Sequence, residues 1–338
     1  MKLDAALPPV SLSEVPAIAK AAEALGFHAL WTTETTHDPF LPHPLIAEHT
    51  TTLHSGTAIA VSFARSPATI AYTAWDLAAQ SGGRFILGLG TQVRAHIERR
   101  FGLEWPASVT GKLREQIQVM RTFWNTWQTG APLNFRGEYY KITLMSPFFA
   151  PTPIPSPASG GGGLVPIYIA GVNTGLAKLA GELCDGFHVH PFHTSQYLAQ
   201  VLLPSIRFGA EKAGRTRSDV TISATVFAAT DETSLAFCRQ QISFYASTPS
   251  YRPVMQLHGW GTVAEKLSSL AMRSQWDEMT AQISDQMLET FAVIADENDL
   301  AAAIQKRYNG LADRVTLYMP FVPGKKDAFW KKLVSHFQ

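Results

Sequence analysis

Short apolar runs alternate with segments of helical periodicity along the whole chain, and this alternation constrains the fold more than any other feature. We predict eight strands, at residues 2–7, 28–33, 55–62, 85–89, 165–170, 186–190, 219–229 and 314–319. Strands that alternate with helices in this order form a parallel sheet covered by those helices. Alternation by itself also fits a doubly wound sheet. The strand count and the length of 338 residues favour an α/β fold closed as a (β/α)8 TIM barrel.

Two segments interrupt the alternation. Residues 247–290 contain no strand pattern, and we predict that they form a helical insertion over one end of the barrel, before the eighth strand. Residues 151–163 are rich in proline and contain four consecutive glycines. They indicate a surface loop and not a linker, because the alternation resumes directly after them. We therefore expect one domain over residues 1–338, with the insertion inside it.

The stretch from Ser81 to Thr91 places Gly88 and Gly90 at the end of an apolar run. A strand buried on both faces has such a run, and glycines at its end let the chain turn or a ligand lie close. A dinucleotide-binding fingerprint needs a third small residue where Val93 stands, so a Rossmann site is not predicted. We expect Gly90 and Thr91, at the end of the fourth strand, to form a wall of the barrel mouth whose small residues leave room for a flat ligand.

Composition narrows the class of protein. The formal charge of +1 predicts no general attraction to nucleic acid or to an anionic membrane. Cys184 and Cys238 lie inside predicted elements and read as buried, reduced thiols. We expect the N-terminal residues to be part of the fold and not a signal peptide, and no membrane-length apolar run of about 18 residues occurs in the sequence. We expect a cytoplasmic protein whose partner is a small-molecule substrate.

Several segments in the right order resemble the luciferase-like flavin and deazaflavin oxidoreductases. They are residues 26–31 followed by the acid Glu34, then 81–90, 167–173, 185–187 and 313–320. The likeness runs from the first strand to the last and is greatest for the branch that uses coenzyme F-420, a 5-deazaflavin hydride carrier. It implies a (β/α)8 barrel with an insertion before the eighth strand, and we also expect a homodimer.

The resemblance implies a flavin-like ring in the barrel mouth, held by a bulge in the third strand that often contains a non-prolyl cis peptide. Ala58 and Ile59 match that bulge, although an ordinary buried strand would have the same sequence. The family usually has an acid followed by histidine after the second strand. Here Glu34 is followed by Thr35, and His37 lies two places further on. We predict that Glu34 and His37 lie beside the reactive ring carbon, one orienting and one exchanging protons.

Other matched positions concern the cofactor. Some relatives have an acid that donates a proton in sugar-phosphate dehydrogenation, and Val93 replaces it, so that activity is not expected. Thr91 is predicted to contact the ring. Gly171, Val172 and Asn173 join a strand to a helix N-terminus, the position of the cofactor phosphate in the family, where free N–H groups and the helix dipole attract an anion.

His188, His190 and His193 form the most conspicuous cluster of polar residues. His188 and His190 lie on the same face of a strand, a pattern that some barrel hydrolases use for zinc. A metal site would need further ligands from other strand ends, and no histidine ends the first strand. We therefore predict no metal site and expect His190 to contact the cofactor or to line the substrate pocket.

The sequence thus predicts hydride transfer between coenzyme F-420 and a small organic substrate, which the high aromatic content suggests is apolar. Three alternatives stay open at this point. They are an FMN-dependent monooxygenase that uses oxygen, a metal-dependent TIM-barrel hydrolase built on the histidines, and a non-catalytic flavin-binding barrel.

Overall fold

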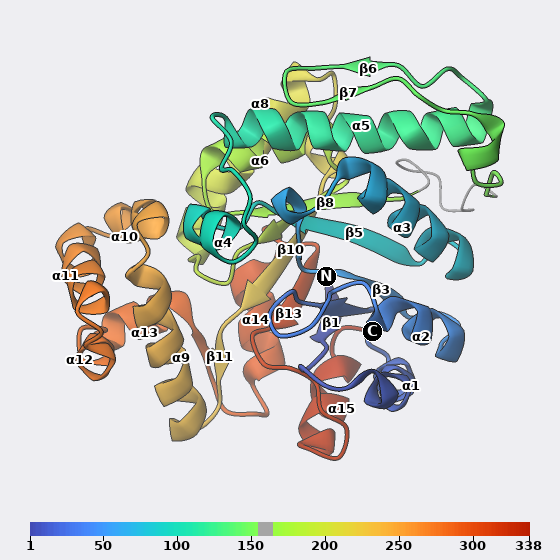
Figure 1. Cartoon of the computed structure of the whole chain (residues 1–338). Coiled ribbons are helices and arrows are strands. Elements are labelled where there is room, and N and C mark those ends of the chain that lie inside the picture. Colours follow the sequence, from blue (N-terminus) through green and yellow to red (C-terminus); the bar gives the residue numbers. More distant parts are fainter. Residues whose placement is uncertain (155–164) are drawn as a thin grey trace.

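A computed structural model describes residues 1–154 and 165–338 of the chain. Its parallel strands close into a barrel, because β1 pairs with both β2 and β13, and β5 pairs with both halves of the third strand (Figure 1). The strands are β1 (Lys2–Ala6), β2 (Ala29–Thr32), β3 (His54–Thr57) with β4 (Ala60–Val61), β5 (Phe85–Gly90), β8 (Ile167–Gly171), β9 (Gly186–Val189), β10 (Thr221–Val226) and β13 (Arg314–Leu317). The predicted (β/α)8 barrel is confirmed.

The third strand differs from the continuous run predicted over 55–62. It is divided into β3 and β4 at a cis peptide bond between Ala58 and Ile59. The amide of Ala58 still donates to the Thr32 carbonyl of β2, at 2.7 Å. The strand therefore bulges at these two residues and then continues along β5.

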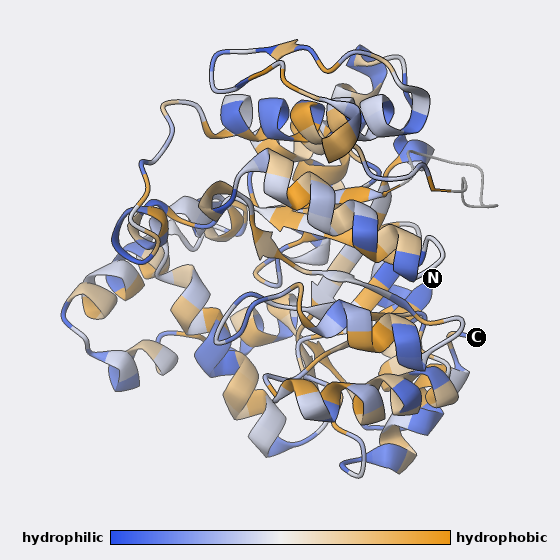
Figure 2. Ribbon diagram, turned by 45° about the vertical axis from the view of Figure 1, so that its right-hand side comes forward, coloured by the Kyte–Doolittle hydropathy of each residue, from blue (hydrophilic) through white to orange (hydrophobic). Residues whose placement is uncertain are grey.

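Helices surround the barrel and turn their apolar faces toward the strands. They are α1 (Val15–Leu25), α2 (Pro42–His49), α3 (Pro67–Gln80), α5 (Val109–Thr129), α6 (Thr174–Leu183), α8 (Leu203–Lys212), α14 (Leu300–Tyr308) and α15 (Asp327–Ser335). Figure 2 shows the hydrophobic residues on the strands and inner helix faces and the hydrophilic ones outside. Among the described residues, no helix is long and apolar enough to cross a membrane.

Two helical segments differ from the elements expected from the sequence. Helix α2 lies between the second and third strands, where no helix is predicted, and its Pro42 is tolerated because it stands in the first turn. The helix expected from Tyr197 to Gly214 begins earlier as α7 (Ser195–Tyr197). It then continues through a π-helical turn, Leu198–Leu202, into α8.

Helices also fill the segment predicted as an insertion. After α9 (Glu232–Ala246) the chain forms α10 (Arg252–Leu257), α11 (Gly261–Met272), α12 (Trp276–Thr280) and α13 (Asp285–Phe291), which lie beyond the strand ends on one side (Figure 1). β11 (Ala228–Ala229) extends β10 and pairs with β12 (Val293–Ile294) in a separate two-stranded sheet. The arm formed by α9 to α13 therefore starts and ends beside the barrel mouth.

A small antiparallel hairpin follows α5 and consists of β6 (Phe135–Arg136) and β7 (Lys141–Ile142). The proline- and glycine-rich loop predicted over 151–163 lies mostly outside the described residues.

Candidate active site at the barrel mouth

A buried ion pair shows which side chains enter the barrel. Arg314 Nε and Nη2 donate to the two carboxylate oxygens of Asp4 at 2.7 and 2.8 Å, and Trp31 Nε1 donates to Asp4 Oδ2 at 3.0 Å. His188 meets the Trp31 ring edge-on, with centroids 4.9 Å apart. Side chains alternate along a strand, so residues two or four positions beyond these point inward at the mouth. They include Tyr318 and His190.

The inward positions at the strand ends divide the mouth into two halves. Strands β1, β2, β3, β5 and β8 contribute small side chains there, whereas β9, β10 and β13 contribute large rings. The small residues are Ala6, Thr33, Ala58, Gly90 and Ala170, and the large ones are His190, Phe227 and Tyr318. The inward positions of the first five strands are therefore small, and an aromatic wall lies on the opposite half of the mouth.

Glu34 braces the bulge. Its carboxylate Oε2 accepts hydrogen bonds from the Val61 amide at 2.6 Å and from Arg65 Nη1 at 2.7 Å, and its side chain is only 6% exposed. The Glu34 amide donates to the Ile59 carbonyl at 3.3 Å. Burial lowers the pKa of Arg65, but the hydrogen bonds and charges of Glu34 and Asp38 together outweigh burial and raise it overall. Glu34 is thus an ion-paired support for the bulge.

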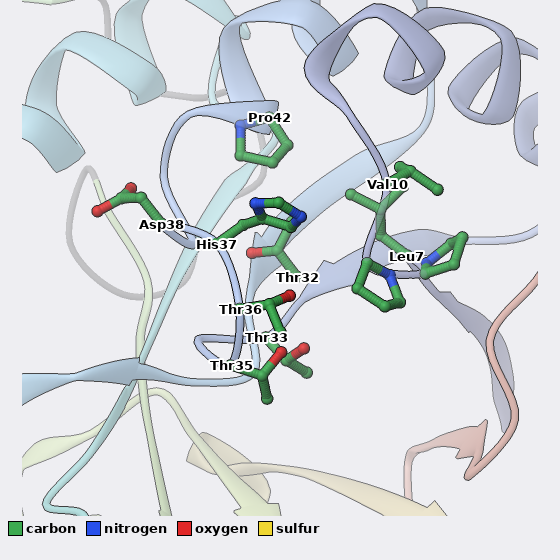
Figure 3. A pocket seen from close by; sticks show the side chains of 11 residues that line it. Leu7, Val10, Thr32, Thr33, Thr35, Thr36, His37, Asp38 and Pro42 are labelled. Atoms are coloured by element: carbon green, nitrogen blue, oxygen red, sulfur yellow. The ribbon is translucent and has the colours of Figure 1, made fainter. Parts of the chain in front are cut away.

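His37 has different neighbours from Glu34, although the two were predicted to act side by side. Its exposed ring lines a shallow pocket between the loops that follow β1 and β2, facing Leu7 and Val10 (Figure 3). In the same view the Asp38 carboxylate points the other way, and it contacts Arg65 Nη2 at 3.0 Å. Thr33, one of the inward residues at the mouth, also lines this pocket.

Gly90 does not leave the open space that was expected. A Cβ on Gly90 would lie 2.6 Å from the Ile59 side chain, so Ile59 fills that position. The bulge therefore directs Ile59 across the end of β5, while Ala58 packs on the interior cluster that contains Trp31 and Tyr168. Both predicted bulge residues lie at the mouth, and the glycine accommodates one of them.

The loop after β5 places Thr91 at the edge of the mouth. The Thr91 hydroxyl, almost buried, donates to the Gln92 carbonyl at 3.2 Å. Gln92 adopts a left-handed conformation with φ 60°, which is uncommon outside glycine and occurs often at functional sites. Its own side chain accepts from the Val93 amide at 3.0 Å. This turn holds Thr91 at the strand end.

The predicted phosphate position lies where β8 passes into α6. Asn173 is the N-cap residue of α6, but its side chain does not cap the helix and instead donates to the Ser250 carbonyl of the insertion at 3.2 Å. The first N–H groups of α6 consequently keep their capacity for an anion. Gly171 is needed for packing as well, because a Cβ there would lie 2.8 Å from Leu176. The Val172 carbonyl accepts from the Tyr197 hydroxyl at 3.1 Å.

His190 lies at the end of β9 under the insertion. The Phe192 amide donates to His190 Nδ1 at 3.1 Å, and the ring contacts Tyr245 and Tyr251 with centroids 4.9 and 4.6 Å away. Burial, with the charge of His193 as the smaller cause, lowers the pKa of His190 to about 3. The ring is therefore neutral, with its proton on Nε2 as a hydrogen-bond donor.

The other two histidines have structural environments. His193 Nδ1 contacts the His190 carbonyl at 2.8 Å, and its Nε2 contacts the Tyr308 hydroxyl at 3.1 Å. His188 is buried in the barrel, where burial lowers its pKa to about 3. Across the described residues, no group of three or more potential ligands is arranged to hold a metal ion. The described residues therefore offer no ligand set for the metal-dependent hydrolase alternative.

Most of the predicted site residues lie in two groups of residues that contact one another. Glu34, Ala58, Ile59 and Gly90 are in direct contact around the bulge. The β8 and β9 ends are linked through the insertion, since Asn173 contacts Ser250 and His190 contacts Tyr251. Thr91 lies between the two groups in the strand order, and His37 belongs to neither.

Sequence reasoning missed three residues that the site uses. Arg65 follows β4 and pairs with Glu34, yet no spacing rule connects two residues 31 positions apart. The hydroxyls of Tyr245 and Tyr318 are hydrogen-bonded to one another, although the two residues are 73 positions apart in the sequence. The parity of β13 offered a signal for Tyr318, because it lies four residues after the buried Arg314 on an alternating strand.

Comparisons with known proteins agree with this architecture. The protein is 42% identical over 323 residues to the uncharacterized protein Rv1360 of Mycobacterium tuberculosis, which covers 93% of this chain and 92% of the relative. The F420-dependent glucose-6-phosphate dehydrogenase of Amycolatopsis mediterranei is 27% identical over 302 residues, covering 84% of this chain and 81% of that protein.

A solved structure has the same fold. The coenzyme F420 dependent tetrahydromethanopterin reductase from Methanopyrus kandleri matches with a TM-score of 0.80 at 21% identity, and the match covers the whole of both chains. Residues 3–314 also match the sequence profile of the luciferase-like monooxygenases. Because this profile covers most of the chain and the barrel is closed, the chain belongs to the luciferase-like monooxygenase family of oxidoreductases.

Proposed function

We propose that the protein transfers a hydride between coenzyme F-420 and a small apolar organic substrate. One observation carries the proposal, namely the bulge at Ala58 and Ile59, braced by the buried Glu34 carboxylate on the small-residue half of the barrel mouth. Similarity to an F420-dependent dehydrogenase and to a coenzyme F420 dependent reductase favours the deazaflavin over FMN.

The residues at the mouth fit such a cofactor. Ala58 and Ile59 would support one face of the ring, with Thr91 at its edge and the His190 Nε2–H as a donor from the other half. The first turn of α6, left uncapped by Asn173, would receive the phosphate of the tail. When bound, the deazaflavin would supply a two-electron hydride carrier that reacts poorly with oxygen, and the protein would supply position and exclude water.

The proposed roles of the two predicted catalytic residues differ. We assign Glu34 as a positioning residue, because both hydrogen bonds to its Oε2 come from the bulge segment and from Arg65. His37 lines the adjoining pocket with its ring exposed to solvent. A homodimer is our proposal for the assembly, resting on the family resemblance alone.

A cofactor titration tests the proposal. The purified protein would be titrated with coenzyme F-420 and, separately, with reduced FMN, following fluorescence. We expect micromolar binding of the deazaflavin and much weaker binding of FMN, and Gly171→Val as the matched variant should reduce deazaflavin affinity. Micromolar binding of FMN alone would overturn the deazaflavin assignment and favour the monooxygenase.

A further inference from the structure

The aromatic half of the mouth contains a phenol hydroxyl that the proposed cofactor site does not use. Tyr318 is the inward residue at the end of β13, and its ring lies 4.8 Å from Phe227 and 6.1 Å from Phe237, which it meets at an interplanar angle of 27°. Tyr318 is half-buried. It therefore places one polar group within an aromatic cluster at the end of β13.

That hydroxyl belongs to a short hydrogen-bonded chain. Tyr245 Oη and Tyr318 Oη are 2.7 Å apart, and Tyr318 Oη donates to Gln241 Oε1 over a longer 3.3 Å. With Gln241 as acceptor of the Tyr318 proton, the Tyr245 hydroxyl is the donor in the short bond. Burial raises the pKa of Tyr245, so it holds its proton at neutral pH. The Tyr318 proton is the one most readily redirected, because its present bond is long.

The surroundings indicate the kind of ligand. Tyr245 lies between Tyr318 and His190, since its ring also contacts the His190 ring at 4.9 Å. On the same helix, α9, the side chains of Phe237 and Phe244 remain 43% and 50% exposed. One hydroxyl within an apolar wall suits a molecule with a single oxygen on a hydrocarbon or aromatic body.

We propose that Tyr318, supported by Tyr245 and Gln241, binds the oxygen of an apolar ketone, aldehyde or alcohol and exchanges the proton that accompanies hydride transfer. The inference rests on the proposed function for the hydride, whereas the binding of the oxygen stands on this geometry alone. It gives the proton to Tyr318 and not to His37, which lies in the separate pocket.

The proton and electron balance is simple. In the reducing direction the carbonyl carbon gains a hydride from the reduced deazaflavin, the co-reactant, and the C=O π pair moves to oxygen. That oxygen forms an O–H bond with the Tyr318 proton, and Tyr318 takes a proton from Tyr245, which water then reprotonates. The carbonyl is reduced to an alcohol and the deazaflavin is oxidised. The reverse sequence oxidises an alcohol.

A matched pair of probes tests the oxygen contact without turnover. Acetophenone and α-methylstyrene have the same shape, but only the first has an oxygen, and ligand-observed NMR gives their affinities for the protein with and without coenzyme F-420. We expect Tyr318→Phe to weaken the binding of acetophenone about three- to tenfold, which is the effect of one neutral hydrogen bond. The affinity for α-methylstyrene should not change.

The control variant is Tyr72→Phe, which removes a hydroxyl bonded to the Phe149 carbonyl at 2.7 Å outside the barrel, and it should change neither affinity. Thermal melting would show that each variant folds. Equal losses for both probes in Tyr318→Phe, or no binding of either probe to the wild type, would overturn the inference.

Turnover tests the proton step. With reduced coenzyme F-420 and acetophenone, Tyr318→Phe should reduce kcat about 100-fold or more, and Tyr245→Phe should reduce it less. If His37→Ala loses activity and Tyr318→Phe keeps full activity, His37 and not Tyr318 exchanges the proton, and our assignment is refuted. If the wild type binds no deazaflavin, the proposed function fails, and the comparison of the two probes still decides the oxygen contact.

Discussion

Replacing Glu34 by glutamine removes one negative charge and almost no volume, so it isolates the electrostatic support of the bulge. Glu34 Oε2 accepts from the Val61 amide at 2.6 Å and from Arg65 at 2.7 Å, and its side chain is 6% exposed. Glutamine can still accept from the Val61 amide. Arg65 keeps its contacts with Asp38 at 3.0 Å and with the Val61 carbonyl at 3.2 Å.

The expected loss of stability is therefore that of one charge-assisted hydrogen bond and not that of a fully buried ion pair. A hydrogen bond to a charged group contributes about 1.5–3 kcal/mol, whereas breaking a fully buried pair costs about 3–5 kcal/mol. We expect Glu34→Gln to lower the free energy of unfolding by about 2 kcal/mol. Because the bulge would be less fixed, deazaflavin affinity and turnover should both decrease.

Urea denaturation of Glu34→Gln, with Asp38→Asn as the matched control, measures this. Asp38 contacts the same guanidinium but is 39% exposed, so its neutralisation should cost no more than about 1 kcal/mol. A double-mutant cycle of Glu34→Gln with Arg65→Met should give a coupling energy above about 1 kcal/mol. Equal destabilisation by the two single variants, together with a coupling energy near zero, would refute the reasoning.

Three further predictions concern other parts of the chain. Gly171→Val should destabilise the protein by about 1–3 kcal/mol through overlap with Leu176, with Gly171→Ala intermediate in thermal melts, and an unshifted melting temperature would contradict that overlap. Asp4→Asn should lower the free energy of unfolding by about 3–5 kcal/mol, because it leaves Arg314 charged inside the barrel. A decrease below about 1 kcal/mol in urea denaturation would show that the fold does not need this ion pair. Hydrogen bonds from three backbone amides outweigh burial and lower the pKa of Glu23 to about 2, so the stability that the Glu23 carboxylate contributes is present above about pH 4.5 and is lost as pH falls toward 2. Glu23→Gln should therefore reduce the change in the free energy of unfolding across that window, and an unchanged acid transition would contradict this expectation.

Local patterns in the sequence determined the elements and their order. Apolar runs, helix caps and prolines act over a few residues, so the eight strands, most helices and the helical segment before β13 could be predicted. The resemblance to known oxidoreductases also located the bulge at Ala58 and Ile59, where the structure has its cis peptide. The missed helix α2 shows the limit of the local rules, since a proline in a first turn looks the same as one in a loop.

Barrel closure decided the partners of the site residues, because it brings together strand ends that are far apart in the sequence. Only the closed sheet places Arg65 on Glu34, Ile59 over Gly90, and Tyr245 against Tyr318. The sequence by itself determined that polar and small residues follow the strands of a barrel. The tertiary structure decided that Glu34 is ion-paired behind the bulge and that Tyr318 is hydrogen-bonded to Tyr245, since contacts between distant segments depend on strand register and closure, which no local pattern encodes.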